Sequence, residues 1–194
     1  MVYRTYQAAY GDRPNAPVPI KLDEFKPDTA EIGKGVVVLE SGWETMMENN
    51  RRAYTAEFVQ RAPFTSAYPT TMTAAEFVDK LFANAGVAPA ASDRAAAINE
   101  FSAAGTSSEA AARGRALRRV AENSALAEQE FNQALVLMQY FGYLRCDANS
   151  GPDTDSAGYN FWLNQLNTFN GNFQNAEMVK AFLLSIEYRG RFPR

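Results

Sequence analysis

The sequence contains no histidine and a single cysteine, Cys146. Without histidine, neither a Ser-His-Asp nor a Cys-His catalytic arrangement is possible. The lone cysteine has no partner for a disulfide within the chain, and zinc sites built from Cys and His side chains are excluded. Any catalysis would therefore rest on carboxylates, lysine, tyrosine or a serine paired with lysine. We expect Cys146, beside Arg145 and Asp147 at a helix end, to be a partly exposed bystander.

The sequence also lacks a strong charge of either sign and a long apolar run. The formal net charge is −3 over 194 residues, with acidic and basic residues mixed along the length, so no nucleic-acid partner is expected. No run approaches the roughly 18 apolar residues of a membrane span, which predicts no membrane insertion. Met1 to Tyr6 lacks the order of charges and apolar residues that marks a signal peptide. With 46% hydrophobic residues, the chain can still bury a substantial core.

What the chain does have is hydrophobic periodicity of the helical kind, which predicts an all-α fold of packed short helical units with little or no sheet. Thr73 and Glu76 predict a capping box, while Ser92 and either Ser107 or Ser108 are expected to cap later helices. Val36–Leu39 is read as an extended segment. The predicted helices cover residues 2–10, 22–32, 43–60, 73–85, 92–101, 108–122, 125–144, 156–167 and 174–187.

Part of the sequence is repeated at one constant spacing, which indicates internal duplication. Aligning the opening helices on Gly11, Gly86 and Gly142 further predicts three units of one degenerate design, each packed against its neighbour. We expect residues 1–70 to form a partial upstream unit and residues 71–194 a helical module, the two packing as one globular body. The recurring residues are Phe58, Phe64, Tyr68 and Pro69, matched by Phe182, Tyr188, Phe192 and Pro193.

Several segments resemble the bacterial "domain of unknown function 4214" family: Phe141–Arg145, Gly158–Leu166, Ala176–Phe182 and Tyr188–Phe192. The resemblance is clearest over residues 130–192, with a partial upstream copy in residues 1–69. It implies a helical module of a large secreted or surface-attached bacterial protein. Such modules stand beside adhesion-type β-sandwich or calcium-binding repeat modules, and no catalytic residues are established for them. The resemblance therefore implies an extracellular or cell-surface location, with neighbouring modules or other proteins as partners.

The loop from Asp147 to Asp155 carries oxygen-bearing side chains at near-alternate positions, as calcium loops do. The candidate ligands are Asp147, Asn149, Asp153 and Asp155. The position of the closing glutamate of an EF-hand is occupied by Gly158, so the loop is not an EF-hand. Calcium is thus one alternative, and the other is a solvated turn in which Asp155 or Ser156 caps the next helix.

The aromatic run that follows suggests a sugar-binding platform, because aromatic faces and amides suit a pyranose ring. The candidate ligand-binding residues are Tyr159, Trp162 and Asn164. The same spacing also fits the buried stripe of an amphipathic helix, which is the more frequent role of such aromatics. A glycan is therefore a second type of partner that the sequence leaves open.

We expect a non-catalytic helical binding or scaffold module. The alternative is a carbohydrate-active or other hydrolytic enzyme in which Asp153, Asp155 or Glu177 act as acid and base near Trp162. Glu44 and Glu48 form another possible carboxylate pair on one helix face. Four arginines between positions 113 and 119 make one helix locally basic, and we expect them to form a solvated face: Arg113, Arg115, Arg118 and Arg119.

Overall fold

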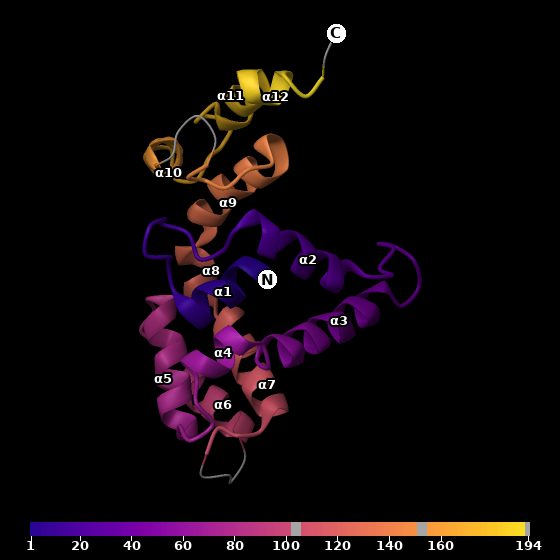
Figure 1. Cartoon of the computed structure of the whole chain (residues 1–194), viewed down its shortest axis with the longest axis vertical. Coiled ribbons are helices and arrows are strands. Elements are labelled where there is room, and N and C mark those ends of the chain that lie inside the picture. The colour runs from indigo at the N-terminus through magenta and orange to yellow at the C-terminus, as the bar shows by residue number, and fades with distance from the viewer. Residues whose placement is uncertain (102–105, 151–154, 193–194) are drawn as a thin grey trace. The chain divides into compact units, whose positions relative to one another are not determined.

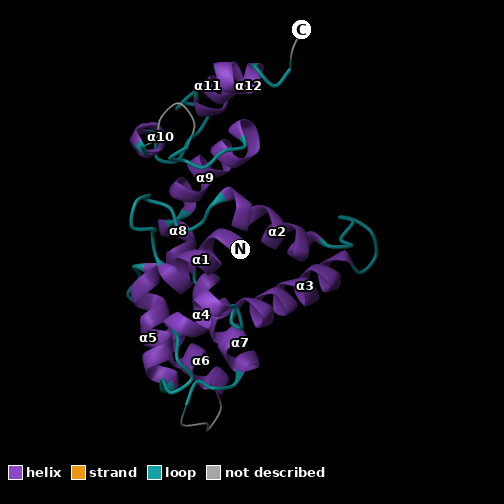
Figure 2. Ribbon diagram, in the orientation of Figure 1, coloured by secondary structure: helices purple, strands orange, loops and turns teal. Residues whose placement is uncertain are grey.

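A computed structural model describes residues 1–101, 106–150 and 155–192. Over these residues the chain forms helices and no strand, as Figure 2 shows, and the predicted all-α class is confirmed. The chain divides into two compact units, and the expected boundary at residue 70 falls inside the first. Unit 1 comprises Met1–Gly11 and Asp23–Ala127, and unit 2 comprises Asp12–Leu22 and Glu128–Arg194.

Unit 1 is organised around its first helix, α1, which packs against α5 and α7, while α3 packs against α7 (Figure 1). α1 is short but almost fully buried, because Tyr3, Tyr6 and two alanines all face neighbouring helices. Its helices are α1 (Val2–Tyr10), α2 (Leu22–Gly33), α3 (Trp43–Phe58), α4 (Ala62–Ala67), α5 (Ala74–Ala85), α6 (Ala91–Ile98), the 3₁₀ turn η1 (Asn99–Phe101) and α7 (Ala110–Ala121).

The predicted capping box begins α5. The Thr73 hydroxyl accepts the Glu76 N–H at 3.2 Å, and the Glu76 carboxylate accepts the Thr73 N–H at 2.8 Å. Gly86 ends the helix in the left-handed conformation at φ 68°, which glycine adopts without strain. Between the caps, Phe77 and Leu81 belong to an apolar stripe that is buried along its length. Local signals therefore set both ends and the buried face of α5.

A buried carboxylate joins three segments of unit 1. Asp28 is 5% exposed and accepts hydrogen bonds from the hydroxyls of Tyr6 at 3.0 Å and Tyr54 at 3.1 Å. Arg61 completes the site with two further bonds at 2.8 and 2.9 Å. Burial, followed by the Asp28 charge, raises the pKa of both tyrosines. Since Asp28 has four donors around it, its charge is buried without being left unpaired.

The predicted solvated arginine face is wrong for Arg113, which is 2% exposed. Its guanidinium donates to the carbonyls of Tyr68 and Pro69 and lies 5.0 Å from the Phe77 ring centroid. The position faces the α5 side of the core, where the long side chain reaches two backbone carbonyls that follow α4. Its neighbour Arg118 forms an ion pair with Glu48 at 2.7 Å, whereas Arg115 and Arg119 are about half exposed.

Unit 2 places α10 against α9, and a π-helical turn, η2, against the two last helices. Its core includes Leu137, Tyr159, Leu166 and Met178, each fully buried. Its elements are α9 (Phe131–Gln139), η2 (Tyr140–Leu144), α10 (Ala157–Thr168), α11 (Met178–Leu184) and α12 (Ile186–Arg189), and α8 (Ser124–Gln129) crosses the boundary between the units.

The single helix predicted over residues 125–144 is wrong, because it forms three elements. Glu130 separates α8 from α9, and its ψ of −2° departs from regular helical geometry. Gly142 lies inside η2 and does not end it. The left-handed residue that ends η2 is Arg145 at φ 55°, whose N–H donates to the Tyr140 carbonyl. The alignment of Gly142 with Gly11 is therefore wrong, and Arg145 is the residue equivalent to Gly11.

Other boundaries also differ from the predictions. Ser185 breaks the helix predicted over residues 174–187, because its backbone is extended and its hydroxyl accepts the Tyr188 N–H at 3.1 Å. The N-cap residues of α6 and α7 are Ala90 and Glu109, and neither makes a side-chain cap bond, so the predicted serine caps are wrong. Val36–Leu39 forms an exposed turn instead of an extended segment, closed by a bond from Glu40 N–H to the Val37 carbonyl at 3.1 Å.

Candidate functional site

Unit 1 contains a row of aromatic rings that links three of its helices, and we call it the unit 1 cluster: Tyr6, Tyr10, Phe58, Phe64 and Tyr68. Tyr6 meets Phe58 edge to face at 5.1 Å and 75°. Tyr10 meets Phe64 edge to face at 6.4 Å and 70°. Phe64 then stacks on Tyr68 at 4.4 Å. Edge-to-face and offset contacts are the favoured geometries of aromatic pairs, so the row fixes the angles between its helices.

Unit 2 contains a second group of rings whose contacts match three of those in unit 1, and we call it the unit 2 cluster: Tyr140, Tyr143, Phe182, Tyr188 and Phe192. Tyr140 meets Phe182 edge to face at 5.2 Å and 79°, and Tyr143 meets Tyr188 at 5.7 Å and 81°. Tyr188 then contacts Phe192 at 5.2 Å. Three of these rings are the ones that recur in the sequence, so the duplication extends to ring geometry.

The backbone repeats as well. Arg61 precedes α4 with φ −62° and ψ 142°, and Ser185 precedes α12 with φ −62° and ψ 153°. These two residues are separated by the same spacing that relates Phe58 to Phe182. The spacing that relates Gly11 to Arg145, both of positive φ, also relates Tyr6 to Tyr140. Each cluster therefore joins an opening helix to a pair of later helices, the returning pair. These are α1 with α3 and α4 in unit 1, and the α9–η2 segment with α11 and α12 in unit 2.

The two clusters differ in burial. Phe58 and Phe182 are both buried, at 0% and 4% exposure. Tyr68 is 0% exposed, whereas its counterpart Phe192 is 63% exposed. In unit 1 the outer rings are covered by α5, whose Phe77 lies 6.0 Å from the Phe64 centroid and 5.1 Å from the Tyr68 centroid. Among the described residues of unit 2, no element occupies the corresponding place.

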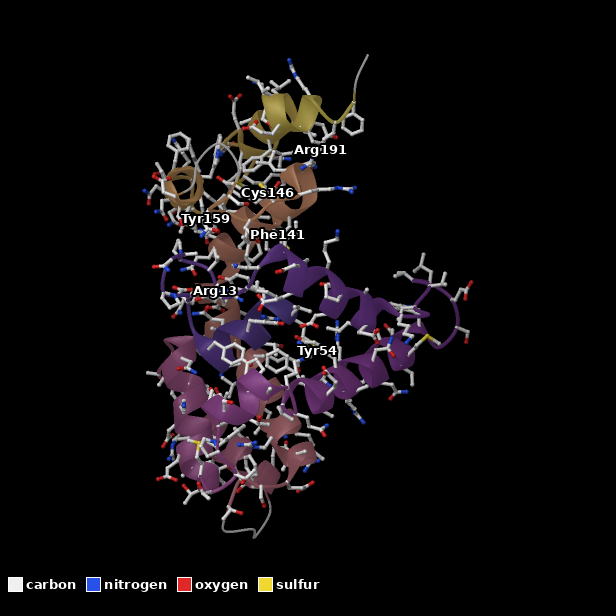
Figure 3. All side chains as sticks on the ribbon, viewed as in Figure 1. Arg13, Tyr54, Phe141, Cys146, Tyr159 and Arg191 are labelled. Atoms are coloured by element: carbon white, nitrogen blue, oxygen red, sulfur yellow. The ribbon has the colours of Figure 1, made fainter. Side chains whose placement is uncertain are left out.

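A cavity of about 400 Å³ borders the unit 2 cluster. Tyr140, Phe182 and Trp162 form its aromatic side, and Cys146 and Glu187 are among its polar groups. Cys146 is labelled in Figure 3, and burial raises the pKa of its thiol, which favours the protonated and less reactive form. Cys146 is partly exposed, as expected, and lines the cavity, while its role as a bystander stays a prediction.

The three candidate sugar ligands are not brought together. Tyr159, labelled in Figure 3, is fully buried, and its hydroxyl donates to the Gln133 carbonyl at 3.2 Å. Trp162 is half-buried and packs 5.7 Å from the Phe182 ring centroid while lining the cavity. Asn164 is exposed, and two residues from Trp162 on the same helix it does not share that face. Trp162 is thus the only candidate of the three on the cavity wall.

The candidate calcium ligands within the described part of the loop mostly bond to the backbone. The Asp147 carboxylate accepts the Leu22 N–H at 2.7 Å, and the Asp155 carboxylate accepts the Ala157 N–H at 3.0 Å at the start of α10. Asn149 is half-buried, and Asp153 lies outside the described residues. No group of three or more His, Cys, Asp or Glu side chains elsewhere in the described chain is placed to hold a metal ion. A calcium site that includes Asp153 stays a prediction.

The carboxylates considered for acid and base roles have partners. Glu177 forms an exposed ion pair with Lys180 at 3.1 Å. Glu48 is bound by Arg118 and Arg52, and chiefly the hydrogen bonds from Arg118 hold the pKa of Glu48 at about 2. A carboxyl that is ionised at neutral pH is a poor general acid. Glu44 is exposed on the same helix.

Tyr140 and Tyr143 were not predicted, because the glycine alignment placed Leu137 and Phe141 opposite Tyr6 and Tyr10. No helix within residues 1–101, 106–150 and 155–192 is long and apolar enough to cross a bilayer.

The chain was compared with protein-family models, curated proteins and solved structures, and it has no significant match among them.

Proposed function

We propose that the protein is a non-catalytic helical binding or scaffold module of a bacterial extracellular or cell-surface protein. The observation that carries the proposal is the repeated aromatic cluster, because the same ring contacts join an opening helix to a returning helix pair in each unit. A protein assembled from such units presents surfaces on which neighbouring modules pack.

The disposition of the reactive side chains supports the same proposal. The most buried carboxylate of unit 1, Asp28, holds three helices together through Tyr6, Tyr54 and Arg61. Glu48 links α3 to α7 through Arg118, and Glu100 links η1 to α7 through Arg115. These ion pairs join helices to one another, which is the chemistry of a structural module. The location outside the cell rests on the resemblance to the domain of unknown function 4214 family, and neighbouring modules are the partners that this resemblance implies.

The proposal is tested by thermal unfolding of the full chain with and without calcium, and then against a panel of glycans. A ligand that binds only the folded state raises the midpoint in proportion to ln(1 + [L]/Kd). We expect no shift with either addition. A calcium-dependent rise that disappears in Asp153→Ala would establish a metal site, and a glycan-dependent rise that disappears in Trp162→Ala would establish a sugar-binding protein. Either result overturns the scaffold role as the main function.

The second candidate is a carbohydrate-active enzyme, favoured by the cavity beside the unit 2 cluster. An aromatic wall at Trp162 with Glu187 on the same cavity is the combination that a sugar site uses. Incubating the chain with an oligosaccharide panel and measuring released reducing ends distinguishes the two functions. Hydrolysis that is lost in Glu187→Gln, with unchanged thermal unfolding, would replace the scaffold proposal.

A further inference from the structure

The outer half of the unit 2 cluster is open on a surface whose counterpart in unit 1 is covered. Position by position, the residues at the start of the repeated segment are buried in both units, as for Tyr54 and Met178 or Phe58 and Phe182. The agreement is incomplete within α11, because Leu183 is 37% exposed and its counterpart Val59 is 1% exposed. For the aromatic rings it ends beyond α11: Phe64 is fully buried while Tyr188 is half-buried, and Tyr68 is fully buried while Phe192 is exposed. The rings on the open surface are therefore Tyr188 and Phe192.

Unit 1 shows what a surface of this design receives. The helix that covers Phe64 and Tyr68 is α5, which follows them directly in the chain and inserts Phe77 against both rings. Lys80, almost one turn later, donates to the Ala67 carbonyl at 2.5 Å and lies 4.8 Å from the Tyr68 ring centroid. The contact thus combines an aromatic anchor with a cation over the outer ring and a hydrogen bond to the end of α4.

We propose that Tyr188 and Phe192 form a docking surface for an amphipathic helix of the α5 pattern, the opening helix of a further helical unit. This inference rests on the proposed scaffold function and names the partner of its unit 2 surface. The incoming helix places a phenylalanine against both rings. A lysine three residues later lies over Phe192 and donates to the carbonyl of Arg191, the counterpart of Ala67. The capping box and buried stripe of α5 define the rest of the partner: a helix apolar on one face and polar on the other.

Not every exposed apolar residue nearby belongs to this surface. Ile186 is 87% exposed, but its counterpart Ala62 is also exposed in unit 1, where α5 is in place. An incoming helix would therefore leave Ile186 uncovered. This pair of residues provides a matched comparison, since Phe192 and Ile186 are both exposed and close in sequence, while only Phe192 corresponds to a ring that α5 contacts.

The probe is a fluorescein-labelled peptide of residues 71–87, titrated with the full chain and followed by anisotropy. We expect saturable binding that Phe192→Ser weakens at least tenfold and Ile186→Ser leaves unchanged. A peptide carrying Phe77→Ser should bind at least tenfold more weakly to the unaltered chain. Because Phe192 is exposed, Phe192→Ser is expected to fold normally, and circular dichroism verifies this. Equal binding to the Phe192→Ser and unaltered chains would overturn the proposal.

An isolated helix of this length is marginally stable in water, so a tethered version accompanies the free peptide. Residues 70–87 are appended directly after Pro193, which recreates the connection between Pro69 and α5 and raises the effective concentration of the helix. We expect a higher thermal midpoint than for the same extension carrying Phe77→Ser and Leu81→Ser. If neither peptide nor extension interacts, the docking surface is refuted. The scaffold proposal would then stand or fall separately on the calcium and glycan measurements.

Discussion

The two aromatic clusters share three ring contacts and differ in the exposure of their outer rings. In unit 1, α5 covers Phe64 and Tyr68, whereas in unit 2 the corresponding Tyr188 and Phe192 face outward. The inner contacts, Tyr6 with Phe58 and Tyr140 with Phe182, differ by 0.1 Å between 5.1 and 5.2 Å. The comparison teaches that the contacts between rings determine how the helices of one unit meet. The burial of the outer rings depends instead on a further helix, which in unit 1 is α5.

The largest predicted effect is a difference in the free energy of unfolding lost when either of two corresponding outer rings, Tyr68 or Phe192, is removed. Tyr68→Ala should lower the free energy of unfolding by about 3–5 kcal/mol, because it empties a fully buried site and removes the hydroxyl that donates to the Ala9 carbonyl at 2.8 Å. Phe192→Ala should cost less than about 0.5 kcal/mol, because its side chain is mostly solvated. Urea unfolding followed by circular dichroism measures both, and similar losses would contradict the assigned difference in burial.

The next effect concerns the buried carboxylate of unit 1. Asp28→Ala should cost about 3 kcal/mol, because it leaves Arg61 and the hydroxyls of Tyr6 and Tyr54 without their shared acceptor. Asp28→Asn keeps an acceptor and should cost less. Unit 2 has Ser185 in place of Arg61, so hydrogen exchange in α11 and α12 should be unchanged. Faster exchange there in Asp28→Ala would show that the two units are not energetically separate.

A smaller effect is expected where α3 and α7 approach closely. A Cβ at Gly114 would lie 3.1 Å from the Ala56 nitrogen and 3.1 Å from the Thr55 carbonyl oxygen, both backbone atoms that cannot swing aside. Gly114→Ala should therefore cost about 2 kcal/mol. Gly142→Ala is the matched control in unit 2, since nothing lies within 4 Å of its added Cβ. A destabilisation of equal size at both glycines, measured by thermal unfolding, would contradict the close approach.

The smallest effect is pH-dependent. Arg118 holds the pKa of Glu48 at about 2 in the folded chain, below its ordinary value of 4.5. The ion pair therefore stabilises the chain above about pH 4.5 and loses this contribution as the pH falls toward 2. Since the Glu48 side chain is 34% exposed, its contribution is about 1 kcal/mol. Glu48→Gln should lose this amount at pH 7 and differ little from the unaltered chain near pH 2. A difference that stays constant from pH 7 to 2 would rule out the pair as its source.

Much of the fold is predictable because its signals are local. The apolar stripe of α5, the capping box at Thr73 and the glycine stop at Gly86 act within one helix, and the structure has all three. The recurrence of Phe64 and Tyr68 as Tyr188 and Phe192 is also seen in the structure, where the two rings of each pair are in contact. Helix ends and buried faces that depend on nearby residues, and residues that recur at a constant spacing, can therefore be predicted from the sequence.

What could not be predicted depends on neighbours distant in sequence. The break at Glu130 and the π-helical turn around Gly142 interrupt a periodicity that looks continuous, because packing outweighs propensity there. The sequence pattern predicts a surface charge at Arg113, yet the side chain is buried, where it donates to two carbonyls 44 and 45 residues away. Among the candidate site residues, Tyr159 shows the same limit. Its aromatic spacing fits both a platform and a core, of which the core is the more frequent, and its burial follows from the packing of α10 on α9.

Hydrogen exchange in the unaltered chain, compared between residues 58–68 and 182–192, tests the central claim most directly. The account predicts that amides of α4 exchange only through global opening of unit 1, since Phe64 and Tyr68 are covered. Amides of α12 should exchange at least a hundredfold faster, and adding the peptide of residues 71–87 should slow them while leaving α4 unchanged. Equal protection of α4 and α12 without the peptide would contradict the claim that one cluster is closed and the other open.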